Sequence, residues 1–127
     1  MHFLVKVGVL ELAVGALTGW AMVYVTRTPR AQRLRAGLRD ARRIRQGHIE
    51  MLMQGTVLTA FGAAVPDPPL FASILLSVVC WTAPLAFFPL AFRPEWGETR
   101  LYRYVDNASL IGLSVGFVLF AVSVLAS

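Results

Sequence analysis

The chain has 127 residues, of which 57% are hydrophobic and 15% charged, and its formal net charge is +5. Soluble domains average about 45–50% apolar and about 25% charged residues, and a small domain has too little interior to bury such an excess. An ordinary soluble fold is therefore excluded, and the single cysteine, Cys80, excludes an internal disulfide. We predict one all-α membrane domain over residues 1–127.

The first apolar run covers residues 3–25 and supplies the roughly 20 residues that cross a membrane core. Glu11 lies in the middle of this run, where an acid costs about 2.5 kcal/mol or more unless it is neutral or paired. One interpretation is a buried hydrogen bond to another helix. The other is a proton-carrying carboxylate, because the small multidrug resistance transporters are similar in length, in their four spans and in a first-helix glutamate.

An arginine-rich segment follows the first span. Eight arginines lie between positions 27 and 45, and Asp40 is the only acid among them. Such a block between two apolar spans is typical of a cytoplasmic loop, and it also suits anionic lipid headgroups. No aromatic residues interleave with the arginines, so we predict membrane lipid as a partner and no nucleic acid.

Three further spans are predicted at residues 44–65, 70–92 and 107–126. The second span is the least apolar, because it carries His48, Glu50 and Gln54. Residues 66–69, with the sequence Pro-Asp-Pro-Pro, form a rigid turn that no helix can continue through. Residues 93–106 form a loop whose aromatic side chains suit the headgroup region.

Topology follows from the arginines. The arginine-rich segment and the 93–106 loop face the cytoplasm, whereas both termini and the 66–69 turn face outward. The prediction is an all-α, integral membrane four-helix bundle in a bacterial inner membrane. Glycines spaced four apart, Gly15 with Gly19 and Gly112 with Gly116, predict close helix packing within the chain.

The second span carries the candidate site. At 100° per residue His48 and Gly55 share one face, so a flat macrocycle could approach that face closely. Histidine is a common axial ligand of haem iron, and Arg42 and Arg45 lie on the water side of His48, where they could pair with propionates. A lone histidine near a helix end is more often simply hydrogen-bonded, and this pattern leaves both interpretations open.

The stretch Gly-His-Ile-Glu-Met-Leu-Met-Gln-Gly at positions 47–55 resembles the signature of a membrane family. That family contains hydroxylaminobenzene mutase and styrene oxide isomerase, and mutase-like members read approximately A-H-L-E-G-L-M-N-G at the start of the second of four spans. The chain length and the preceding arginines also agree. The positions that match in identity and spacing are His48, Glu50, Leu52, Met53 and Gly55.

The resemblance implies a homotrimer with haem b between subunits and His48 as the axial ligand. Gln54 would take the place of an active-site asparagine that orients the substrate oxygen. The iron would act as a Lewis acid in a rearrangement without net redox change. The implied substrate is a small apolar epoxide or arylhydroxylamine, so the chain is expected to be an intramolecular isomerase or mutase.

Two departures from the family bear on this expectation. Gln54 is one methylene longer than asparagine, and Ala83 stands where the family tends to place an asparagine on the third span. A chain that has kept only the scaffold would be a structural or accessory membrane protein, which is the first alternative. A small proton-coupled multidrug transporter that uses Glu11 is the second.

Overall fold

The structure is a computed structural model that describes residues 2–126. All its elements are helical, and no strand occurs within the described part of the chain. The predicted all-α class is thereby confirmed. In chain order the elements are α1 (Phe3–Arg27), α2 (Arg30–Arg35), α3 (Ala41–Ala64), α4 (Leu70–Leu85), α5 (Phe87–Phe92), the 3₁₀ helix η1 (Pro94–Glu98) and α6 (Arg100–Leu125).

Three segments are long and apolar enough to cross a membrane, namely Phe3–Arg27, Leu70–Phe92 and Arg100–Leu125. They correspond to the first, third and fourth predicted spans, and their length and composition suggest a helical membrane protein. The helix α3 covers the second predicted span but is not one of the three, because arginines and polar side chains occupy its first half.

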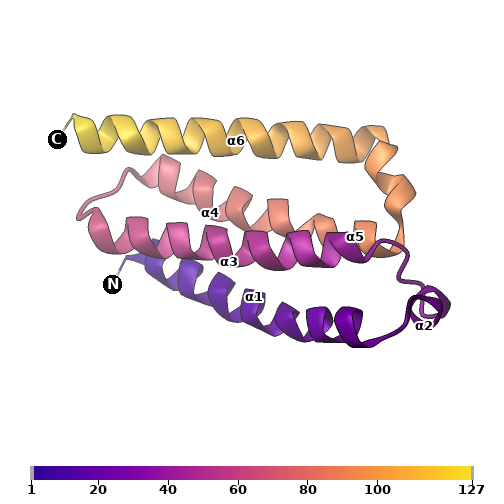
Figure 1. The fold of residues 1–127 in the computed structure, drawn as a ribbon. Coiled ribbons are helices and arrows are strands. Elements are labelled where there is room, and N and C mark those ends of the chain that lie inside the picture. The colour runs from indigo at the N-terminus through magenta and orange to yellow at the C-terminus, as the bar shows by residue number, and fades with distance from the viewer. Residues whose placement is uncertain (1, 127) are drawn as a thin grey trace.

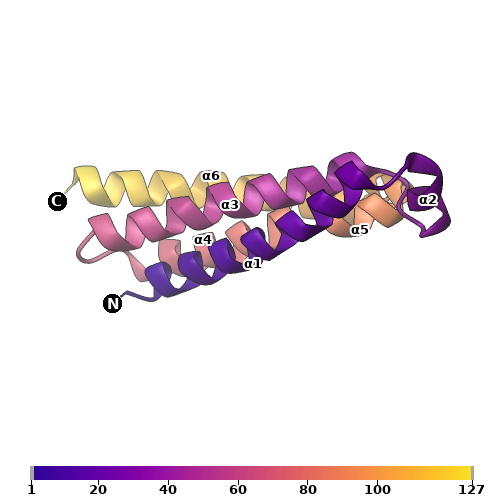
Figure 2. The ribbon, with the colours of Figure 1, turned by 60° about the horizontal axis from the view of Figure 1, so that its bottom comes forward.

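The long helices run roughly alongside one another, and from the bottom to the top of Figure 1 their order is α1, α3, α4 and α6. The helix α1 packs chiefly on α3, and α6 packs chiefly on α4, while α3 also contacts α4 and α5. Both termini lie at one end of the molecule and α2 lies at the other in both views (Figures 1 and 2). The arginine-rich segment is therefore at the end away from the termini, which is the arrangement that the predicted topology requires.

Glycines let neighbouring helices approach closely. A Cβ atom added at Gly8 of α1 would lie 2.8 Å from the carbonyl oxygen of Gly55 of α3, so backbone meets backbone there. On α6, a Cβ atom added at Gly112 or Gly116 would lie 2.8 or 2.7 Å from a side-chain atom of α4. The prediction that Gly112 and Gly116 serve packing within the chain is confirmed. In lipid, close packing of this kind replaces the hydrophobic effect as the force that holds helices together.

The connection before α6 differs from the prediction. A loop was expected over residues 93–106, but η1 occupies Pro94–Glu98 and α6 begins at Arg100. The hydroxyl of Thr99 accepts a hydrogen bond from the backbone N–H of Tyr102 at 3.4 Å, which caps the helix at this point. The helix therefore extends beyond the apolar run that the hydropathy marked.

Candidate functional site

The ring of His48 lies near the start of α3 and packs against α1. Its Nδ1 atom lies 2.8 Å from Oγ1 of Thr18 and 2.8 Å from the carbonyl oxygen of Gly15. A Cβ atom added at Gly19 would lie 3.4 Å from Cε1 of His48, which is an ordinary van der Waals distance, so the ring lies directly against this part of α1. About one turn of α1 thus holds one edge of the imidazole.

These contacts determine which ring nitrogen carries the proton. The carbonyl oxygen of Gly15 can only accept, and it already accepts the hydroxyl proton of Thr18. A proton on Nδ1 of His48 satisfies both neighbours, because Nδ1–H then donates to the carbonyl and to Oγ1. In a neutral ring the lone pair is therefore on Nε2. An Nδ1–H bond to a backbone carbonyl is the arrangement that orients histidines which bind metals through Nε2.

No family model, no curated protein and no solved structure matches the chain. Within residues 2–126, no three His, Cys, Asp or Glu side chains gather in a group that would hold a metal ion. The chain has two histidines. The other, His2, accepts a hydrogen bond at Nδ1 from the backbone N–H of Leu4 at 3.1 Å, so its proton is on Nε2. His48 alone presents Nε2 as a base.

Glu50 and Gln54 form a second polar group on the adjacent face of α3. The side-chain N–H of Gln54 donates to Oε2 of Glu50 at 3.3 Å, and both residues are half-buried. The amide oxygen of Gln54 is buried and has no hydrogen-bond partner among the described residues. An unsatisfied acceptor inside a protein costs about 1–3 kcal/mol, so this oxygen is poised to accept a hydrogen bond.

Gly55 lies deeper on the His48 face, and α1 fills the space beside it. A Cβ atom added at Gly55 would lie 3.0 Å from the carbonyl oxygen of Gly8 and 3.0 Å from the backbone nitrogen of Leu12. The open surface that we predicted for a flat macrocycle at this glycine is therefore a helix–helix contact. The close approach of two backbones explains the glycine here.

The predicted propionate partners, Arg42 and Arg45, lie in the first two turns of α3. Together with Arg43 and Gln46 they line a hollow of about 270 Å³. The Nε atom of Arg42 lies 3.5 Å from a carboxylate oxygen of Asp40, and the Arg42 side chain is 79% exposed. The guanidinium groups are thus accessible for a carboxylate ligand, and solvent screens their present ion pairs.

Glu11 is fully buried in the interior of the helix assembly. Neither of its carboxylate oxygens has a hydrogen-bond partner within the described part of the chain. The hydrogen bond to another helix that we predicted is therefore not formed among residues 2–126. Such an acid is expected to be neutral, because an unpaired charge is far more costly to bury.

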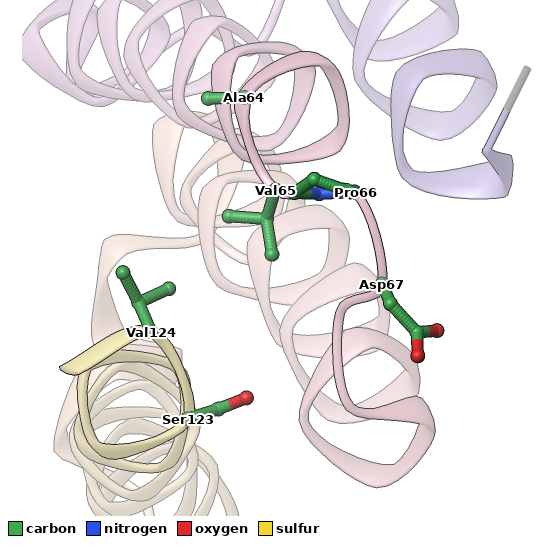
Figure 3. Close-up of a pocket in the computed structure, with 6 residues that line it drawn as sticks. All are labelled: Ala64, Val65, Pro66, Asp67, Ser123 and Val124. Carbon is green, nitrogen blue, oxygen red and sulfur yellow. The ribbon is translucent and has the colours of Figure 1, made fainter. Parts of the chain in front are cut away.

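A separate hollow of about 320 Å³ lies at the end of the molecule that carries the termini. In Figure 3 the end of α3 and the last turns of α6 border it, and the side chain of Asp67 points away from Ser123. At 1.5 Å per residue Ala64 lies about 24 Å along α3 from His48. This hollow is therefore not part of the His48 site.

Thr18 is a residue of the site that was not predicted from the sequence. It stands three residues after Gly15 and just before Gly19, so the three share one face of α1. A hydroxyl beside two glycines on one face of the helix was the available signal. Which residue of α3 it would meet depends on how the two helices are rotated against each other.

Proposed function

We propose that this chain is a haem-dependent isomerase that forms a four-helix membrane bundle, with Nε2 of His48 as the axial ligand of haem b. The observation that supports this proposal best is the pair of contacts at Nδ1, from Gly15 and Thr18, which leaves Nε2 basic and fixes the plane of the ring. The resemblance of residues 47–55 to the mutase and isomerase family supplies the cofactor and the reaction class.

The side chains fit haem at two of the three predicted points. His48 offers a lone pair, and Arg42 and Arg45 offer accessible guanidinium groups to two carboxylates. Gly55 does not fit, because α1 covers it, so it has no part in the proposal. Haem iron would supply Lewis acidity when bound.

Gln54 is the proposed catalytic residue. Its amide oxygen is buried without a partner, and its amide nitrogen is held by Glu50 at 3.3 Å. That contact fixes the orientation of the amide, so the free oxygen can accept a hydrogen bond from the N–H or O–H of an arylhydroxylamine. Positioning a substrate in a dry site lowers the barrier by lowering the entropic cost of alignment. The substrate that we propose is a small apolar arylhydroxylamine or epoxide.

The proposed assembly is a homotrimer in the inner membrane, with both termini outward and the arginine-rich segment cytoplasmic. Support comes from α3, whose polar residues make it a poor neighbour for lipid. A second copy of the chain would cover polar groups that lipid cannot satisfy. The eight arginines at the end opposite the termini support the orientation.

Absorption spectroscopy tests the haem proposal. Protein purified from haem-replete cells is expected to show a Soret band that His48→Ala abolishes. The matched control is His2→Ala, which removes the other histidine and should leave the band unchanged. A colourless wild-type preparation, or a band that survives His48→Ala, would contradict the assignment.

The same contacts also favour a non-catalytic alternative. His48 links α3 to α1 through Thr18 and Gly15, so its role would be to hold the two helices together in an accessory membrane protein. In that case His48→Ala lowers the unfolding temperature, and the wild-type protein binds no haem.

The transporter alternative rests on the buried, unpartnered carboxyl of Glu11. It predicts that cells expressing the chain export cationic drugs and that Glu11→Gln abolishes this export. Equal export by the Glu11→Gln variant and the wild type would exclude it.

A further inference from the structure

The arginine-rich segment between α1 and α3 is held in a defined shape. Gly37 ends α2 with φ at +89°, a left-handed conformation that favours glycine. The backbone N–H of Leu38 then donates to the carbonyl of Arg33 at 2.9 Å, and the Leu38 side chain is only 5% exposed. Leu38 packs in an apolar cluster with Ile44 and Ala91.

The next two residues are tied to α5. The backbone N–H groups of Arg39 and Asp40 donate to the carbonyl oxygen of Ala91 at 2.8 and 2.9 Å. The segment is therefore anchored by a buried leucine and by two hydrogen bonds to a neighbouring helix. Its arginines project from a fixed frame, so they can form a binding site without a large cost in ordering the chain.

A hollow of about 430 Å³ lies within this frame. Four guanidinium groups and one carboxylate line it, so the lining is strongly cationic. Asp40 pairs with Arg42 at 3.5 Å, and Arg33 donates to the carbonyl of Val25 at 3.3 Å. The charged lining residues are Arg30, Arg33, Arg39, Arg42 and Asp40.

Among these four arginines, Arg39 forms an ion pair with a residue that does not line the hollow. It lies 3.5 Å from Glu95 of η1, and the two side chains are 56% and 51% exposed. An exposed pair of this kind is worth about 0–1 kcal/mol, so it can exchange for a stronger anion. Arg30 has no ion pair among the described residues. Arg30 and Arg39 are therefore available to donate hydrogen bonds to an anion that presents two oxygen atoms, such as a phosphate group.

Leu34 adds an apolar wall to the same hollow. It belongs to α2, lines the cavity, and is 47% exposed. The short helix α2 sits at the end of the long helices (Figures 1 and 2). In a chain that crosses a membrane this end is where headgroups meet acyl chains. A free inorganic anion has no apolar group that could pack against an exposed leucine, whereas the glycerol and acyl chains of a phospholipid can.

We propose that this hollow binds the phosphodiester of an anionic phospholipid, with Arg30 and Arg39 on the phosphate and Leu34 against the glycerol and upper acyl chain. Basic pockets at the cytoplasmic ends of membrane helices bind such headgroups. The hollow shares Arg42 with the proposed propionate partners, but the proposal rests on Arg30, Arg39 and Leu34, so it stands whether or not the chain binds haem.

Native mass spectrometry of the detergent-solubilised full chain tests the proposal, with phosphatidylglycerol as the probe and phosphatidylcholine as the neutral control. Each arginine near the membrane surface strengthens the binding of an anionic lipid. The Arg30→Gln/Arg39→Gln double variant should therefore weaken phosphatidylglycerol binding by about 10- to 30-fold. The matched control is Arg100→Gln/Arg103→Gln, which removes the same charge from exposed positions of α6. It should change binding by less than about threefold.

A second variant separates the two sources of phosphate. Leu34→Ser should weaken phosphatidylglycerol binding while leaving the charge unchanged, and millimolar inorganic phosphate should not displace the lipid. If the two double variants weakened phosphatidylglycerol binding equally, the proposal would be overturned, since the lipid would then respond only to the total positive charge of the protein. Displacement by inorganic phosphate with no effect of Leu34→Ser would also overturn it. Circular dichroism confirms that each variant folds.

Discussion

The contact between α1 and α3 makes a sharp prediction at Gly8. A Cβ atom in Gly8→Ala would lie 2.6 Å from the backbone nitrogen of Thr59 and 2.8 Å from the carbonyl oxygen of Gly55. These are backbone atoms, so no side-chain rotation can relieve the overlap and the two helices must move apart. Overpacking of this kind costs about 1–3 kcal/mol.

Gly19→Ala is the matched control, because it makes the same change in the same helix. There the nearest atom to the added Cβ, Cε1 of His48, is 3.4 Å away, an ordinary contact. Alanine improves helix propensity by about 1 kcal/mol at both positions, so the difference between the two variants isolates the packing cost. We expect Gly8→Ala to be less stable than Gly19→Ala by about 1–3 kcal/mol.

Reversible unfolding in mixed detergent micelles measures both variants. Equal stability of Gly8→Ala and Gly19→Ala would refute the backbone contact. The His48 contacts depend on the same helix pair, so the account also requires that Gly8→Ala weakens haem retention, while Gly19→Ala leaves it closer to the wild type.

Three further predictions follow from the buried polar groups. Glu11→Leu should raise the free energy of unfolding by about 1–3 kcal/mol, because it removes a buried acid without a partner; a loss of stability in a thermal melt would count against that environment. Thr18→Val should cost only about 0.5–1.5 kcal/mol and keep the Soret band, since the Gly15 carbonyl still holds the Nδ1 proton; complete loss of haem from this variant would show that the hydroxyl is the main support. Gln54→Leu should abolish rearrangement of an arylhydroxylamine with the Soret band intact, and product formation by gas chromatography at the wild-type rate would remove Gln54 from catalysis.

The helices themselves were largely predictable from hydropathy. The rigid Pro66–Pro69 turn and the long apolar runs predicted the all-α class and four spans, and three of these four correspond to segments that are long and apolar enough to cross a membrane. The start of α6 at Arg100 was not predictable from the apolar run, because the Thr99 cap extends the helix into polar sequence. Gly112 and Gly116 were correctly placed at a helix contact, since small residues in lipid serve packing.

The candidate site was predictable only in part. The position of His48 near the start of a helix followed from the sequence, but its partners are 30 and 33 positions away on another helix. Those partners depend on the rotation of α1 against α3, which close contacts such as Gly8 with Gly55 determine. The same rotation covers Gly55, and for that reason a face that looked open in the sequence is filled.

The most direct test of the account is the position of the proton on His48. Nitrogen-15 NMR of the haem-free protein with labelled histidine, recorded at an alkaline pH at which the spectra show neutral rings, reads the protonation of both ring nitrogens. The hydrogen bonds of the two rings predict opposite tautomers, with the proton on Nδ1 in His48 and on Nε2 in His2, and the His2→Ala variant assigns the signals. A proton on Nε2 of His48 would contradict the account, because that nitrogen could then offer no lone pair to iron.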